Sequence, residues 1–127
     1  MYYLLRYLIS CPILLISRLY PTVGRGKTDE LILDAINKRG FPDDQDAGSE
    51  MIKQAAEGIG LAQPTKITAS NVIEPMTTSA LRAGTLPQDT VMGKLLQKTA
   101  EKMGGTPIKV RSGENAGNIW MEVDISY

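Results

Sequence analysis

The side chains that could do chemistry in this 127-residue chain are limited by its composition. There is no histidine and only one cysteine, Cys11, while 14 basic and 14 acidic residues balance to a formal charge of zero. The composition therefore excludes Ser–His and Cys–His pairs, imidazole ligands for zinc, multi-cysteine metal sites and an internal disulfide. Aromatic residues make up 6% of the chain, which disfavours a base-stacking surface. We predict a non-enzymatic protein without catalytic residues, metal or cofactor.

A glycine-rich segment is the one spacing that approaches a phosphate-binding loop. The segment Gly24-Arg25-Gly26-Lys27-Thr28 follows apolar residues 13–16, and its lysine and threonine are the types that reach phosphates and magnesium. The position of the loop's first glycine holds Pro21, which has no N–H to give to a phosphate. Nucleotide binding through a degenerate loop at 24–28 is one alternative function. A linker followed by a helix N-cap is the other interpretation of the same residues.

The elements that would position these groups follow from apolar spacing and turn residues. Apolar side chains recur at helical spacing in several segments that begin at a capping residue and end at glycine. Residues 64–76 lie between two prolines and fit a short helix, a strand or a loop. Helices are predicted from Thr28 to Gly40, from Ser49 to Gly60, from Thr77 or Thr78 to Gly84, and from Asp89 or Thr90 to Gly104.

The carboxy-terminal residues have the pattern of a β-hairpin. Residues 108–111 and 120–125 alternate apolar with polar side chains, and the turn residues 113–117 separate them. This alternation predicts a hairpin with one buried face. We therefore expect an α+β fold that is mostly α: a small helical domain over 27–127 with a C-terminal hairpin, preceded by an apolar N-terminal helix within residues 1–20.

The apolar amino-terminal segment, residues 2–20, leaves three interpretations open. Arg6 and Arg18 interrupt it, and Pro12 would kink a helix in its middle. A buried helix or helix pair is one interpretation, and a membrane anchor with the two arginines reaching the interface is another. A targeting segment is the third. A membrane-associated interaction domain anchored by residues 2–20 is thus an alternative to a cytoplasmic protein.

Charge is distributed unevenly along the chain. Residues 61–112 carry seven basic and three acidic side chains, whereas residues 26–60 carry four basic and eight acidic ones. A basic segment could face the phosphates of a nucleic acid. Lysines scattered over a solvated surface would give the same count.

About residues 50–110 resemble the Xre/λ-repressor-like helix-turn-helix family. The segments Ile52–Ala55 and Gly60–Gln63 are similar to that family's first helix and the entry into its second helix. Residues Thr77–Gly84 are similar to its recognition helix, and Pro87–Gly105 to its closing helices. Pro64 departs from the pattern, because the family's second helix runs on from the glutamine, and the stretch to Met76 is longer than the family's turn.

The resemblance implies a DNA-binding regulator that represses a promoter, with an antitoxin paired with a toxin as one form of it. The recognition helix would enter the major groove of double-stranded DNA. A homodimer is expected, joined through the hairpin or the apolar amino terminus. By the same resemblance, the DNA-contacting residues are Gln63, Lys66, Thr77, Thr78, Ser79 and Arg82, of which Arg82 would pair with a guanine or a phosphate.

Overall fold

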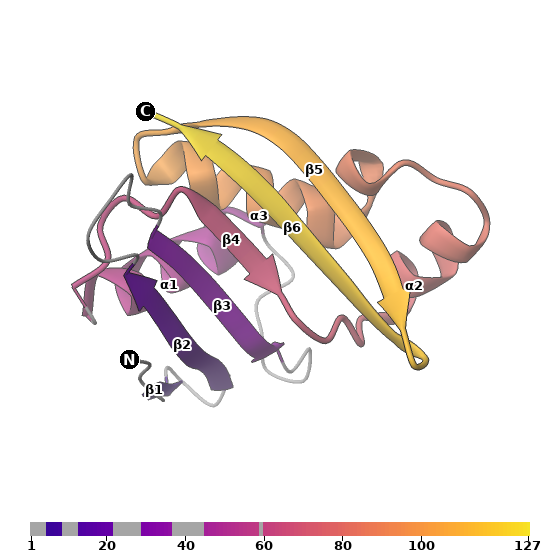
Figure 1. The fold of residues 1–127 in the computed structure, drawn as a ribbon, viewed down its shortest axis with the longest axis horizontal. Helices are drawn as coiled ribbons and strands as arrows, with labels where there is room; N and C mark the ends of the chain where they lie inside the picture. The colour runs from indigo at the N-terminus through magenta and orange to yellow at the C-terminus, as the bar shows by residue number, and fades with distance from the viewer. Residues whose placement is uncertain (1–4, 9–12, 22–28, 37–44, 59) are drawn as a thin grey trace.

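The computed structural model of the chain describes residues 5–8, 13–21, 29–36, 45–58 and 60–127, which form a mixed sheet with helices packed against one side (Figure 1). The described strands lie in the order β1-β2-β3-β4-β6-β5, and only the β3–β4 pair is parallel. In chain order the elements are β1 (Leu5–Leu8), β2 (Ile13–Pro21), β3 (Asp29–Ile36), α1 (Gln45–Gly58), β4 (Lys66–Ala69), α2 (Pro75–Arg82), the 3-10 helix η1 (Pro87–Asp89), α3 (Val91–Lys102), β5 (Thr106–Asn115) and β6 (Asn118–Ser126).

The expected fold class, mostly α with an apolar N-terminal helix, is wrong. Within the described residues, three α-helices accompany a sheet of six strands, and the amino-terminal segment contributes β1 and β2 to that sheet. Both strands are short apolar runs, and runs of this length fit a strand as well as a buried helix. β2 pairs antiparallel with β1 and with β3. The hydrogen bonds of these ladders satisfy the backbone groups of the segment, and this favours strands over a helix.

The segment predicted as a helix between Thr28 and Gly40 is the strand β3. Leu31, Ile32 and Leu33 are all buried, with 0%, 6% and 1% of their surface exposed. A continuous apolar run buried on both faces is typical of a strand in the middle of a sheet, whereas a surface helix has only one apolar stripe. Parallel pairing with β4 also settles residues 64–76, whose first half is a strand.

The main hydrophobic core lies between the sheet and the helices α1 and α3. Leu31 and Leu33 of β3 and every second residue of β4 and β6 point into it, and fully burying one such aliphatic side chain contributes about 1.5–3 kcal/mol. The helix predicted to begin at Ser49 begins at Gln45 instead, and the Ser49 hydroxyl is not an N-cap but donates to the carbonyl of Asp46 inside the first turn. Core residues include Leu31, Leu33, Ile52, Ala55, Ala56, Ile67, Leu95, Leu96, Ala100, Met121 and Val123.

The prediction of α3 and of the hairpin is confirmed. Thr90 caps α3 by accepting a hydrogen bond from the N–H of Gly93 at 3.0 Å, and Gly104 follows the helix with φ 89°. The hairpin pairs β5 with β6 and buries Val123 and its apolar neighbours. Helix α2 starts earlier than predicted, because the carboxylate of Glu74 caps it.

Candidate functional site

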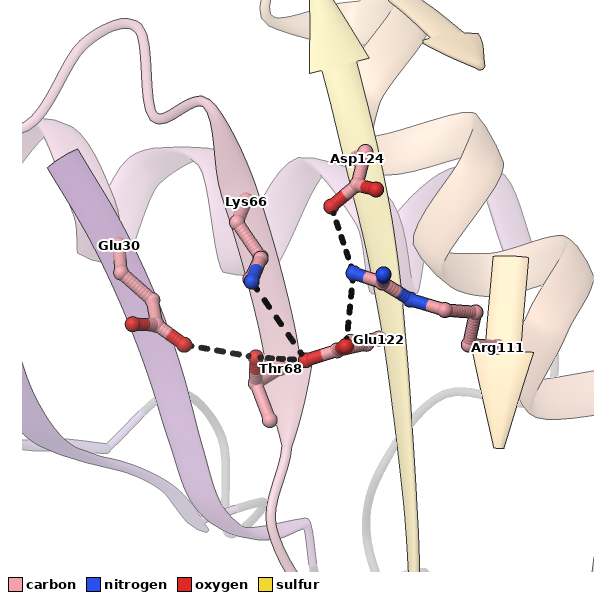
Figure 2. A network of polar contacts seen from close by, with 6 residues as sticks. All are labelled: Glu30, Lys66, Thr68, Arg111, Glu122 and Asp124. Carbon is pink, nitrogen blue, oxygen red and sulfur yellow. Dashed lines mark hydrogen bonds and ion pairs between the residues drawn. The ribbon is translucent and has the colours of Figure 1, made fainter. Parts of the chain in front are cut away.

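The sheet face turned away from the helices carries a row of polar side chains. Successive side chains of a strand point to opposite faces, so the residues between those buried in the core share this face. Across β3, β4 and β6 the register aligns Glu30, Lys66 and Asp124. We call the six polar residues that meet here the open-face network (Figure 2): Glu30, Lys66, Thr68, Arg111, Glu122 and Asp124.

The Arg111 guanidinium bridges two carboxylates of the open-face network. Its Nη2 is 2.7 Å from Oε1 of Glu122 and 3.0 Å from Oδ1 of Asp124 (Figure 2). The side chains of these carboxylates are only 17% and 26% exposed, so solvent screens the ion pairs less than it would on an open surface. This guanidinium therefore ties β5 to β6 on the outer face of the sheet.

Thr68 joins carboxylates from the two strands that flank β4. Its hydroxyl lies 3.1 Å from Oε1 of Glu30 and 3.4 Å from Oε2 of Glu122, and it can donate its hydrogen to either oxygen. The Nζ of Lys66 is 4.0 Å from the same Oε2 of Glu122. Because its carboxylates are already engaged by cations and a hydroxyl of the fold, the open-face network is suited to holding strand register.

Trp120 lies against the backbone of β5 on the same face. Gly113 is its cross-strand partner, and a Cβ at Gly113 would come within 2.4 Å of Cζ2 of the indole ring. Only glycine permits this approach, so the ring covers β5 rather than standing out from the sheet.

The outer strand β5 presents a free edge of the described sheet (Figure 1). The hairpin turn consists of Ala116 and Gly117 with φ of 53° and 84°, which is the type I′ pattern of a two-residue loop. In such a hairpin the flanking residues, Asn115 and Asn118, form a hydrogen-bonded pair, and hydrogen-bonded and non-bonded pairs alternate from there.

The alternation directs three backbone units of β5 away from the sheet. Arg111 and Gly113 direct their N–H and C=O groups towards β6, whereas Val110, Ser112 and Glu114 direct theirs outward. Within the described residues, no hydrogen bond of a turn, loop or side chain uses these outward groups. The edge therefore offers three N–H donors and three C=O acceptors, with side chains of the same residues on the helix side.

Two hollows lie between this edge and the helices. The first, which we call the lysine hollow, has a volume of about 340 Å³ and lies between the start of β5 and the helices η1 and α3. Lys109 is the only charged residue in its lining, and its register partner is Asp124, so its exposed side chain belongs to the sheet face turned away from the helices. The lining residues are Gln88, Gln97, Pro107, Ile108, Lys109 and Val110.

The second hollow, which we call the leucine hollow, lies between the end of β5 and α2. Its volume is about 210 Å³, and its apolar lining consists of Leu81 and Ile119. Arg82 and Glu114 contribute one positive and one negative charge to its rim, so its net charge is zero. Its lining residues are Leu81, Arg82, Ser112, Gly113, Glu114 and Ile119.

The beginning of β5 is protected against pairing. Pro107 lacks an N–H, and the register shifts between Pro107 and Lys109, which leaves Ile108 without a cross-strand partner and 63% exposed. Proline, lysine and a bulge are the devices that proteins place on edge strands. These residue types are the sequence signal that could have identified β5 as an edge, and sequence reasoning missed it.

The six residues predicted to contact DNA do not form one surface. Gln63 is exposed in the loop before β4, and no helix follows it, since Lys66 begins a strand. The ammonium of Lys66 belongs to the open-face network. The second helix of a helix-turn-helix is therefore absent from the described residues at the place where the resemblance requires it.

The other four predicted residues lie together on α2, but only some of them face solvent. Thr77 is completely buried, and its hydroxyl is used inside the fold. Thr78 is half-buried and donates to the carbonyl of Pro75, while Ser79 and Arg82 are exposed. DNA binding stays a prediction, and this placement does not support entry of α2 into a groove.

The remaining alternatives concern the amino-terminal half. The glycine-rich segment 24–28 lies outside the described residues, and it is followed by β3 rather than by the helix that a phosphate-binding loop must open. No helix in the described part of the chain has the length and apolar character needed to cross a membrane.

Among the described residues, no group of three or more cysteine, aspartate and glutamate side chains could hold a metal ion.

Comparisons with protein-family models, with curated proteins and with solved structures found no match to this chain.

Proposed function

We propose that this chain is a non-enzymatic binding module that takes up an extended segment of a partner polypeptide as an additional strand along β5. The observation that carries the proposal is the row of outward backbone groups at Val110, Ser112 and Glu114, flanked by two hollows. In this mode of recognition the backbone hydrogen bonds give affinity, and pockets for alternate side chains give specificity.

The energetics require both the edge and the hollows. Six backbone hydrogen bonds at about 0.5–1.5 kcal/mol each contribute roughly 3–9 kcal/mol. Association costs on the order of 4–15 kcal/mol in lost freedom of motion. Backbone pairing alone therefore gives weak binding at best, and side chains of the partner must bury apolar surface in the hollows.

The antitoxin expectation included a protein partner, and the proposed function also requires a polypeptide partner. The open-face network does not favour a nucleic acid, because its three carboxylates stand beside only two cations. The predicted homodimer competes for the same edge, since a second copy could pair β5 with β5.

Amide hydrogen exchange tests the proposal at single residues. In the free protein, the amides of Ser112 and Glu114 should exchange fast, because they point to solvent, while those of Arg111 and Gly113 should be protected by β6. The probe is a synthetic peptide selected for binding from a displayed library of short random sequences. Its addition should protect Ser112 and Glu114 and leave the other two amides unchanged.

A pair of variants at one position provides the matched control. Ser112→Pro removes an outward N–H without removing a bond to β6, so peptide binding should be lost while the fold persists. Ser112→Ala keeps the N–H and should bind as the wild type does. Protection confined to other elements, or equal binding by both variants, would contradict the proposal. A concentration-dependent dimer in sedimentation that Ser112→Pro abolishes would assign the edge to a second copy instead.

A further inference from the structure

The end of β5 has apolar surface on both faces of the sheet. On the helix side lies the leucine hollow, with Leu81 and Ile119 as its apolar walls. On the outer face lies the half-buried indole of Trp120. A Cβ at Gly113 would lie 2.4–2.8 Å from Cζ2, Cε2 and Nε1 of this ring, so the indole occupies the place of the missing side chain on β5.

The beginning of β5 has a different character. Its outer face carries the cations Lys109 and Arg111, which stand opposite carboxylates of β6. On the helix side, Gln88 and Gln97 contribute amide groups to the lining of the lysine hollow. A strand added along β5 therefore meets polar groups at this end, and the apolar burial that strand addition requires must come from the end near Gly113.

The pleat of an added strand determines which of its residues meet the two apolar surfaces. Directly opposite residues of paired strands share a face, with Cβ atoms about 4.5–5.5 Å apart. The partner residue opposite Gly113 therefore lies on the outer face beside the indole. Its neighbours along the partner chain point to the helix side, opposite Ser112 and Glu114, and both of these residues line the leucine hollow. Side chains alternate in this way whichever direction the partner chain runs.

We infer that the polypeptide bound at β5 carries two consecutive apolar residues, an aromatic one that packs on Trp120 and an aliphatic one that fills the leucine hollow. This inference rests on the proposed function. Aromatic pairs gain from offset-stacked or edge-to-face packing beyond the area that they bury, so an aromatic side chain suits the indole. The leucine hollow has a volume of about 210 Å³ and aliphatic walls, and its rim carries one charge of each sign, so it favours a neutral aliphatic side chain.

Synthetic threonine-rich peptides without tryptophan test this pattern by calorimetry. One peptide carries phenylalanine followed directly by leucine, and a second carries the same two residues separated by one threonine, which places both on one face. The adjacent pair should bind at least about 10-fold more tightly, since full burial of one such side chain contributes about 1.5–3 kcal/mol and about 1.4 kcal/mol is a factor of ten. Equal affinities of the two peptides would overturn the inference.

The fluorescence of Trp120 tests the aromatic contact in the unaltered protein. Trp120 is the only tryptophan of the chain, so its emission reports on this part of the outer face. Because the indole is half-buried in the free protein, packing of phenylalanine on it should shift the emission to shorter wavelength. A peptide with threonine in place of phenylalanine should bind more weakly and give a smaller shift at saturation. An equal shift with this peptide would overturn the aromatic half of the pattern.

A double-mutant cycle locates the contact in the protein. Trp120→Thr should reduce the effect of replacing the peptide's phenylalanine with threonine by about 2- to 12-fold, since an aromatic pair contributes about 0.5–1.5 kcal/mol beyond its buried area. Lys109→Thr is the matched control, because Lys109 lies on the same face near the beginning of β5, and it should leave that effect unchanged. An equal change in both variants would overturn the contact with Trp120.

The outcomes separate this inference from the proposed function. Binding that protects the Ser112 amide but does not distinguish adjacent from separated pairs would overturn the consecutive pattern and leave strand addition standing. An emission shift without protection of the Ser112 amide would place the peptide elsewhere on the outer face and overturn both proposals. Failure of every peptide to bind would also overturn both.

Discussion

The hydroxyl of Thr77 in α2 accepts a hydrogen bond from the backbone N–H of Met92 in α3 at 3.0 Å, and it donates to the Glu74 carboxylate at 2.7 Å. The first amides of a helix have no partner within that helix. Thr77 supplies one for α3, while Glu74 supplies partners for α2 by accepting from the amides of Met76 and Thr77. One buried hydroxyl thus joins the starts of two helices.

Replacing Thr77 should destabilise the fold. Thr77→Val keeps the shape of the side chain but leaves the Met92 amide buried without an acceptor, so we expect the free energy of unfolding to fall by about 1–3 kcal/mol in urea denaturation. Thr78→Val is the control, because its hydroxyl bond to Pro75 is exposed; its effect should be smaller. Equal losses of unfolding free energy in the two variants would show that the buried hydroxyl between α2 and α3 contributes no more to stability than an exposed one.

Glycine 93 should be irreplaceable, although it lies inside a helix. A Cβ at Gly93 would lie 1.9 Å from the carbonyl oxygen of Pro87, so Gly93→Ala must displace η1 and should lower the free energy of unfolding by about 1–3 kcal/mol. At Gly58, near the end of α1, an added Cβ meets nothing within 4 Å. Gly58→Ala should therefore stabilise by about 0.5–1 kcal/mol. Thermal unfolding of the two variants, measured side by side, checks the opposite signs.

Loss of the Arg111 guanidinium should weaken the hairpin. Arg111→Met leaves Glu122 and Asp124 close together without their shared cation, and we expect a loss of about 1–2 kcal/mol, between the values for exposed and buried pairs. Lys109→Met, which removes an exposed cation without an ion pair, should change the free energy of unfolding by less than about 0.5 kcal/mol. If high salt leaves the difference between these variants unchanged, it does not arise from charge.

Stability should decline at high pH through Tyr127. Burial raises the pKa of Tyr127 to about 12, and its hydroxyl donates to the carbonyl of Pro64 at 2.7 Å. Because the pKa is higher in the folded chain than the ordinary value of 10.0, this contribution is complete below pH 10 and is lost as the pH rises towards 12. Absorbance titration should show one late-ionising tyrosine that is missing in Tyr127→Phe, and an identical titration of both proteins would refute this assignment.

Local sequence patterns were sufficient to predict α3 and the C-terminal hairpin. The Thr90 cap, the apolar spacing behind it and the glycine after Met103 are interactions between neighbours in the chain, so residue types alone predict them. The same holds for the alternation along β6, whose apolar residues face the core. For the candidate site, the sequence predicted the hairpin, whereas the edge signal at Pro107–Lys109 was present in the sequence but was missed. The six predicted DNA contacts rested on resemblance.

Only the tertiary structure decided which strands lie side by side. Leu31 and Ile32 were predicted to lie on the apolar stripe of a helix, and the parallel pairing of β3 with β4 makes them part of a strand. Lys66 was predicted to contact DNA, and its ammonium lies 4.0 Å from a carboxylate oxygen of Glu122. The edge position of β5 follows from β4 occupying the other side of β6, a contact between residues more than fifty positions apart. Such pairings depend on backbone hydrogen bonds and burial that neither segment can satisfy alone, and so no local pattern encodes them.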